Sequence, residues 1–289
     1  VSIDWMEYLI YFTGNTMKKI QIILVTIFLS LLTTAIASMA YANPTLSVFD
    51  CGLLAFDDVS AFGITNNDTE VRELFVPCYL ISHDDHLMVW DAGLPLSDVG
   101  RTDSNTRYRK SFIDQLAEMN IGTSEIDFVA FSHMHYDHVG AANAFSEATL
   151  LIQGTEAVAA FEHPEDNPVF RPELYADLLS SNRTTLNGDY DVFGDGSVRI
   201  ISAPGHTPGH QALYLELENF GPLILSGDLY HFEVSRELRR TPVFNTDAEE
   251  TLRSMDKVEA LIRSTDATFW IEHSKELAES LNLAPAVYD

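Results

Sequence analysis

Residues 128–140 read F-V-A-F-S-H-M-H-Y-D-H-V-G, and this stretch decides how the rest of the chain is interpreted. It continues an apolar run that begins at Ile126, and such a run predicts a buried β-strand. Four side chains that can bind metal ions follow this strand closely: His133, His135, Asp137 and His138. Functional side chains are common in loops that directly follow a buried strand, because the rigid sheet fixes their position. The stretch therefore predicts a metal site at a strand end.

Three further apolar strands are followed closely by a histidine or an aspartate. The strands are predicted at 198–202, 223–225 and 268–271, and the residues after them are His206, Asp228 and His273. One such histidine would most often be structural, but four strand ends with the same pattern indicate a shared site. A catalytic zinc ion takes four ligands and keeps one position open, so these candidates fit two ions that share a carboxylate.

The ligand types indicate the chemistry of the site. Nitrogen and carboxylate ligands without cysteine favour zinc and would also accept manganese, iron or cobalt. A purely structural zinc site does not fit, because the candidates come from both halves of the chain. Two ions about 3.5 to 4 Å apart can activate water at neutral pH and polarise a carbonyl or phosphoryl oxygen. The sequence thus predicts a hydrolase with two divalent metal ions as cofactors.

The first 42 residues have the pattern of a leader. Met17 and two lysines precede an uncharged apolar run to about Ala37, and A-Y-A follows at 40–42. A basic start, an apolar centre and a small-residue cleavage site are typical of a secretory signal. We expect residues 1–16 to be an upstream extension, residues 17–42 a signal peptide, and residues 43–289 one periplasmic or secreted domain without stable membrane association. The alternative is a membrane anchor, because the run is nearly long enough to span a bilayer.

The net charge of −26 is extreme for 289 residues. Such a surface repels phosphate backbones and anionic lipid heads, which argues against nucleic acid as a partner and favours a neutral small-molecule substrate. Export would permit a disulfide between Cys51 and Cys78, but buried thiols on neighbouring strands fit equally well. The sequence leaves this choice open, as it does the choice between a monomer and a homodimer.

Strands and helices alternate through the rest of the chain. Further strands are predicted at 46–54, 73–82, 86–90, 149–153 and 211–217, and helices at 110–119, 154–162 and 247–264. In the last helix, Leu252, Met255 and Val258 recur at helical spacing behind a Thr246 or Asp247 cap. Region 163–196 is too long for a simple connection and is predicted to be a lid or substrate wall. The pattern predicts two mixed sheets packed together with helices outside.

The ligand pattern H-x-H-x-D-H with its three later partners resembles the metallo-β-lactamase superfamily over nearly the whole mature chain. The resemblance implies an α/β (α+β) fold, the αββα four-layer sandwich, with the metals at one edge. It implies that the first ion is held by His133, His135 and His206. It implies that the second is held by Asp137, His138 and His273, with Asp228 as the bridge.

Within the superfamily, P-G-H-T-P-G-H-Q at 204–211 resembles the N-acyl homoserine lactonases and some exported organophosphate hydrolases. An aspartate bridge argues against a true β-lactamase. Well-known lactonases carry a tyrosine three residues after the bridge, where it contacts the lactone, whereas here Tyr230 lies two residues on and His231 three. His231 is predicted to donate to the leaving alkoxide or to be an ordinary loop residue. The predicted catalytic residues are Asp137, Asp228, His231 and Tyr230.

The resemblance implies an enzyme that opens the ring of N-acyl homoserine lactones, an activity known as quorum quenching. The acyl tail is expected to lie against Phe56 and Phe62 on one side and against Phe170 and Tyr175 on the other. The alternatives are an exported organophosphate or ester hydrolase and a non-catalytic metal-binding member of the fold. Asp91, at a strand end, is expected to orient a metal-binding histidine.

Overall fold

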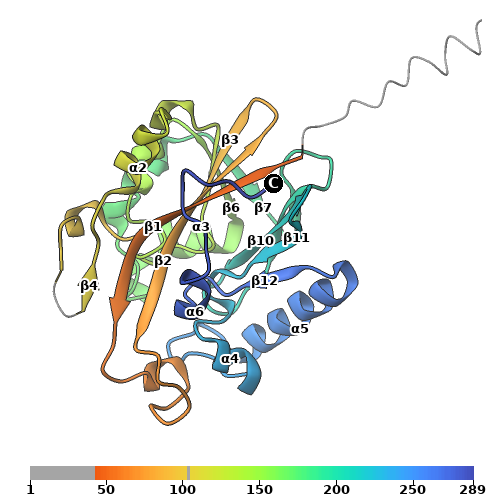
Figure 1. The fold of residues 1–289 in the computed structure, drawn as a ribbon. Helices are drawn as coiled ribbons and strands as arrows, with labels where there is room; N and C mark the ends of the chain where they lie inside the picture. Colours follow the sequence, from red (N-terminus) through yellow and green to blue (C-terminus); the bar gives the residue numbers. More distant parts are fainter. Residues whose placement is uncertain (1–42, 103–104) are drawn as a thin grey trace, which may run out of the picture. The chain divides into compact units, whose positions relative to one another are not determined.

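Two β-sheets packed face to face form the centre of the protein, and helices cover both outer faces (Figure 1). The structure, a computed structural model, describes residues 43–102 and 105–289. The extension and signal peptide predicted at 1–16 and 17–42 lie outside the described residues. Among the described residues, no helix has the length and apolar character needed to cross a bilayer.

The first sheet has seven strands in the order β4-β1-β2-β3-β5-β6-β7. The strands are β1 (Thr45–Ala55), β2 (Glu73–His83), β3 (His86–Ala92), β4 (Thr106–Arg107), β5 (Phe128–Ala130), β6 (Thr149–Gln153) and β7 (Arg183–Leu186). The tight turn between β2 and β3 makes the predicted antiparallel hairpin, and β3, β5, β6 and β7 then run parallel. Parallel strands bring their carboxyl ends to the same edge of the sheet.

The second sheet has five strands in the order β12-β11-β10-β9-β8. They are β8 (Tyr190–Asp191), β9 (Val198–Ser202), β10 (Gln211–Leu217), β11 (Gly221–Leu225) and β12 (Thr268–Trp270). β10 runs antiparallel to both β9 and β11, and β12 runs parallel to β11. The strands β9, β11 and β12 therefore all end at one edge.

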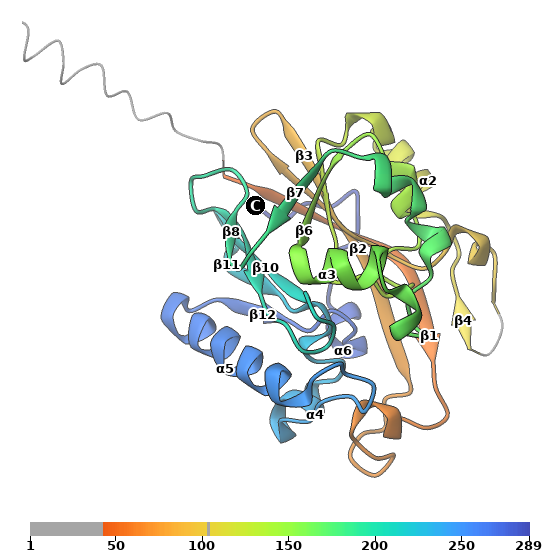
Figure 2. The same cartoon turned by 180° about the vertical axis from the view of Figure 1, so that it is seen from behind.

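Helices form the two outer layers, as Figure 2 shows from behind. The α-helices are α2 (Phe112–Glu118), α3 (Gly154–Phe161), α4 (Glu233–Leu238), α5 (Ala248–Thr265) and α6 (Lys275–Ala278). Short 3-10 helices lie at η1 (Ser60–Phe62), η2 (Leu96–Asp98), η3 (Thr123–Glu125), η4 (Ala142–Phe145), η5 (Pro164–Asp166), η6 (Pro172–Leu174), η7 (Ala176–Ser180) and η8 (Gly227–Leu229). Asp247 caps α5 by accepting from the N–H of Glu250.

Three apolar cores lie between these layers and hold them together. Between the sheets, Trp90 and Tyr79 of the first pack with Leu213 and Leu225 of the second. A second core lies between the first sheet and its helices, and a third joins the second sheet to α5 through Met255 and other residues. β10 is buried at all but one position, because both of its faces are covered. The predicted αββα sandwich is confirmed.

Two local features differ from, or extend, what the sequence indicates. The prediction that 163–196 forms a lid is wrong for its second half, because β7 extends the first sheet beside β6 and β8 extends the second beside β9. Only η5, η6 and η7 remain as an irregular wall. Cys51 and Cys78 form a disulfide that joins the neighbouring strands β1 and β2.

Candidate metal centre

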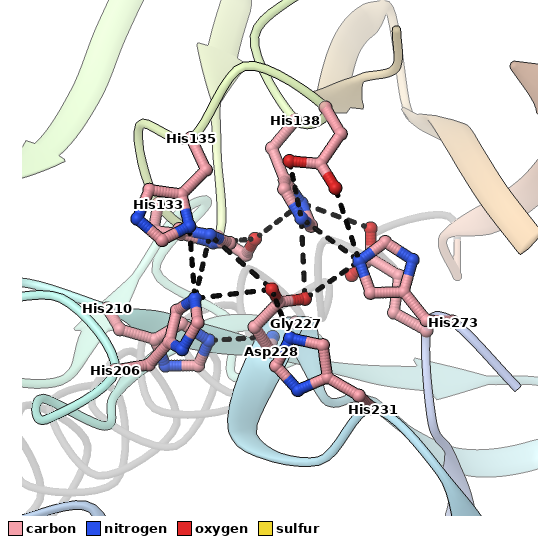
Figure 3. Close-up of polar contacts among 12 residues, drawn as sticks. His133, His135, His138, His206, His210, Gly227, Asp228, His231 and His273 are labelled. Carbon is pink, nitrogen blue, oxygen red and sulfur yellow. Dashed lines mark hydrogen bonds and ion pairs between the residues drawn. The ribbon is translucent and has the colours of Figure 1, made fainter. Parts of the chain in front are cut away.

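The seven predicted ligands gather at one edge of the sandwich, where strands of both sheets end (Figure 3). The loop after β5 supplies four of them, and the loops after β9, β11 and β12 supply one each. The ligands His133, His135, His138, His206, Asp228 and His273 are at most 3% exposed. The predicted pattern of strand ends is therefore one site in space.

The first cluster joins His133, His135 and His206 to one side of Asp228. The Nε2 of His206 lies 3.2 Å from the Nε2 of His133 and 3.2 Å from the Nδ1 of His135. The Oδ2 of Asp228 lies 3.2 Å from the same His206 nitrogen and 3.6 Å from the Nε2 of His133. Three nitrogens and one carboxylate oxygen thus face a common point.

The second cluster joins Asp137, His138 and His273. The Nε2 atoms of His138 and His273 lie 3.2 Å apart, and the Oδ1 of Asp228 lies 3.3 and 3.0 Å from them. The carboxylate of Asp137 is more distant, at 4.0 Å from His138 and 3.9 Å from His273. Asp228 turns one oxygen to each cluster, which is the bridging arrangement that the resemblance implies.

These side chains fit two divalent cations. The Oδ1 of Asp228 is buried without a hydrogen-bond partner, although such an atom is costly to leave unpaired. The Nε2 of His206 lies 3.2 Å from one imidazole nitrogen of His133 and from one of His135, and such contacts are not favourable unless a cation or a proton lies between the nitrogens. The donor set of imidazole and carboxylate without thiolate suits zinc and similar ions.

The electrostatics of the two clusters differ. Burial, with neighbouring histidines, holds the pKa values of His133 and His135 well below the usual range. Burial would also lower the pKa of His273, but Asp228 outweighs it and raises the value to about 9. The carboxyl group of Asp228 is buried as well, yet His231, His273 and other histidines hold its pKa well below normal.

Two buried carboxyl groups stand behind His138. Its Nδ1 lies 3.2 Å from the Oδ2 of Asp91 and 3.5 Å from the Oε1 of Glu272. The Oδ1 of Asp91 also accepts from the N–H of Ser132 at 2.7 Å. Burial and the nearby Asp91 raise the pKa of Glu272 to about 8. Asp91 thus lies where the sequence predicts an orienting residue, and Glu272 is an additional one.

The structure separates the two predicted catalytic residues that follow the bridge. The Nε2 of His231 lies 2.9 Å from the Oδ2 of Asp228, so His231 belongs to the site. Tyr230 points away: its hydroxyl lies 3.4 Å from Glu259 and its ring packs against Phe269 in the core under α5. The prediction that places Tyr230 among the catalytic residues is therefore corrected, because successive residues in this extended segment face opposite sides.

Aromatic rings and a cavity flank the metal centre. Phe62 and Phe244 contact the ring of His231, with centroids 5.0 and 5.9 Å away. On the other side, Phe170 contacts the ring of His135 at 5.6 Å. Phe170 also lines a cavity of about 540 Å³ whose other walls are Gly154, Thr155, Val158, Ala159, His163, Asp166, Asn167, Pro208 and Thr246. Tyr175, expected in this wall, is buried with its hydroxyl on Ala160.

Sequence reasoning missed several residues that support the ligands. Glu272 directly precedes His273, and that position at a strand end was a usable signal. Asn167 places its Nδ2 3.0 Å from the Nε2 of His135, and Glu156 accepts from backbone N–H groups beside the ligands. Asn167 does not follow a strand, and Glu156, although it comes three residues after β6, lies in the first turn of a helix, so no sequence pattern distinguishes them from ordinary surface or helix positions.

A strand-edge site with two histidine clusters and a shared aspartate in an αββα sandwich defines the class of protein. The model of the metallo-beta-lactamase superfamily matches residues 71–263. The N-acyl homoserine lactonase AttM of Rhizobium radiobacter is 31% identical over 189 residues, 61% of this chain and 68% of that protein. A Bacillus sp. N-acyl homoserine lactonase is 26% identical over 240 residues, 79% of this chain and 92% of that protein.

Solved structures are similar to the fold as a whole. A quorum-quenching N-acyl homoserine lactone lactonase has a TM-score of 0.74 at 24% identity, over 86% of this chain and 98% of that chain. An N-acyl homoserine lactone hydrolase with N-hexanoyl-L-homoserine at its catalytic metal centre has a TM-score of 0.72 at 24% identity, over 86% and 99%. The chain belongs to the metallo-β-lactamase superfamily and is a metal-dependent hydrolase of that family.

Proposed function

We propose that this enzyme opens the lactone ring of N-acyl homoserine lactones with two bound zinc ions. The observation that carries the proposal is a carboxylate shared by two histidine clusters beside an apolar cavity, in a chain similar to curated lactonases of that substrate. Two such ions would supply Lewis-acid polarisation of the lactone carbonyl and an activated water. Water then adds to the carbonyl carbon and the ring ester bond breaks, which leaves a carboxylate and a free hydroxyl.

The residues of the chain have distinct tasks in this proposal. Asp228 contacts both clusters and would fix their distance from each other. Asp137 lies on the solvent-accessible side of the second cluster, with 13% of its side chain exposed. Burial lowers the pKa of His231, which favours the neutral imidazole. A neutral imidazole donates from one nitrogen only, and its Nε2 faces the Asp228 carboxylate. Its Nδ1, which is buried without a hydrogen-bond partner, is then an acceptor, so donation to the alkoxide would require a protonated ring.

The cavity beside His135 suits the acyl tail. Its volume of about 540 Å³ lies within the range of small-molecule sites. Val158, Ala159 and Phe170 give it apolar walls, and Val158 is 45% exposed there. An apolar tail would cover this surface, and a neutral substrate agrees with the acidic charge of the chain.

A substrate panel tests the proposal. The metal-loaded protein is assayed by proton release with lactones of increasing acyl length, with paraoxon as the probe for the organophosphate alternative and a cephalosporin as a control. Val158→Trp should lower kcat/KM for long-chain lactones and leave short-chain lactones unchanged. Val287→Trp, at a site 50% exposed and outside the cavity, is the matched control. Metal-loaded protein that is inert toward every lactone would overturn the proposed activity.

We further propose that the mature chain acts in the periplasm or outside the cell, after cleavage behind Ala42, and without a membrane anchor. The disulfide between Cys51 and Cys78 supports this, because disulfides persist in oxidising compartments. Fractionation of cells that express the full chain, with N-terminal sequencing of the product, tests it. Size-exclusion chromatography of the same product distinguishes a monomer from a homodimer.

A further inference from the structure

Glu156 is a buried carboxylate that the proposed chemistry leaves without a task. It lies in the first turn of α3 and only 1% of it is exposed. Burial raises its pKa, although the Thr207 side chain and the N–H groups of Met134 and Gly209 partly offset this. A buried acid is costly unless its oxygens are hydrogen-bonded, so the groups that satisfy this carboxylate indicate what it does.

The two oxygens of Glu156 join the two loops that supply the first cluster. The Oε1 accepts from the N–H of Met134 at 2.9 Å, and Met134 lies between His133 and His135. The Oε2 accepts from the N–H of Gly209 at 2.8 Å, in the loop that begins with His206. These loops are more than seventy residues apart in the chain, and one carboxylate fixes the distance between them.

The backbone of the first turn of α3 packs directly against the backbone of the His206 loop. A Cβ at Gly209 would lie 2.5 Å from both the Cβ and the backbone nitrogen of Glu156, so this position has no room for a side chain. Thr155 donates from its hydroxyl to the carbonyl of Pro208 at 2.8 Å. The contact between α3 and this loop is therefore close enough to transmit small displacements of the helix to His206.

We propose that Glu156 is a positioning residue that sets the geometry of the first metal cluster before an ion binds. The second cluster has supports of its own, because His138 is held by Asp91 and the Nδ1 of His273 lies 2.6 Å from the carbonyl oxygen of Phe75. Loss of Glu156 should therefore weaken the first ion selectively. The inference rests on the two-ion centre of the proposed function and does not depend on which ester or lactone is hydrolysed.

Metal affinity in Glu156→Gln and Glu156→Asp tests this role. The amide of glutamine can accept from only one of the two N–H groups, and aspartate keeps the charge but is too short to reach both. In each variant the first ion should bind about 10- to 100-fold more weakly, as is typical when a partner of a metal ligand is lost. Zinc content should fall from two ions per chain toward one in competition with a chromogenic chelator. Glu162→Gln, which makes the same change at the exposed C-cap of the same helix, should retain both ions.

Two measurements separate positioning from general stabilisation. Leu116→Ala removes a buried side chain of α2 and should lower the melting temperature without changing either metal affinity. If Glu156→Gln behaves in the same way, the proposal is wrong. In the metal-free wild type, the amides of Met134 and Gly209 should already be protected from hydrogen exchange, and rapid exchange would also overturn it. A protein that binds both ions normally but opens no lactone would count only against the proposed substrate.

Discussion

The two metal clusters are built from the same kinds of ligand but have different surroundings. Backbone N–H groups anchored on Glu156, and an apolar cavity, lie behind the first cluster. The buried carboxyl groups of Asp91 and Glu272 lie behind the second. Burial and neighbouring histidines depress the pKa values of His133 and His135, whereas Asp228 outweighs burial and raises the pKa values of His138 and His273. The clusters thus differ in what surrounds them: buried carboxyl groups lie against the second, while the first lies beside the apolar cavity.

The largest effect is expected from Asp228→Asn, which removes the group that both clusters share. An uncharged amide can present only one oxygen, so it cannot bridge two cations. Lewis-acid assistance is worth several kcal/mol in the transition state, so hydrolysis should slow by about a thousandfold or more. Turnover and zinc content together measure this loss. Asp195→Asn is the matched control, because Asp195 also pairs with a buried histidine, His83, at 2.7 Å, but outside the metal centre.

A smaller effect, limited to metal binding at the second cluster, is expected from Asp91→Asn. One oxygen of Asp91 accepts from Ser132, so the amide that replaces the other oxygen would present N–H groups to the Nδ1–H of His138. The second ion should bind about 10- to 100-fold more weakly and the first should be unaffected. Separate affinities from chelator competition measure this difference. Equal weakening of both ions would show that the two clusters are not independently supported.

His231→Ala should reduce turnover by about tenfold, at the low end of the range for partners of metal ligands. The variant loses the contact with Asp228 at 2.9 Å and the ring that packs on Phe62. Tyr230→Phe should leave turnover unchanged, because the hydroxyl that it removes faces Glu259. Steady-state rates of the two variants compare them directly. A loss in Tyr230→Phe as large as in His231→Ala would contradict the placement of these side chains.

The sequence predicts which candidate ligands lie together, because the residue type at a strand end is a local feature. A strand direction and a residue type at its end placed His206, Asp228 and His273 without any knowledge of the sheets. The same rule does not identify the role of Glu156, because its partners are backbone N–H groups that lie 22 and 53 residues away in the chain. It also misjudged Tyr230, because which of two neighbouring residues faces the site depends on the turn in η8.

Short elements were missed for a related reason. β7 and β8 have four and two residues, and their strand character comes from pairing with β6 and β9 and not from their own composition. The long helix α5 carries its own cap and apolar stripe, so it was predicted almost to the residue. Local pattern thus predicts long elements and strand-end ligands, whereas edge strands and supporting contacts depend on the folded context.

Glu272→Gln should have the smallest effect at neutral pH, since the pKa of about 8 means that Glu272 largely keeps its proton there. An amide of the same shape then replaces a neutral acid. The expected difference appears in the pH dependence of stability in the metal-free protein. Between the ordinary glutamate pKa and about 8, the folded wild type retains a proton that the unfolded chain has lost, so its free energy of unfolding falls as pH rises through this window. Glu272→Gln should lack this decline, and denaturant titrations from pH 5 to pH 8 measure it. If the free energy of unfolding has the same pH dependence in both proteins, Glu272 is ionised in the folded wild type. The second cluster would then carry one more negative charge than a protonated Glu272 gives it.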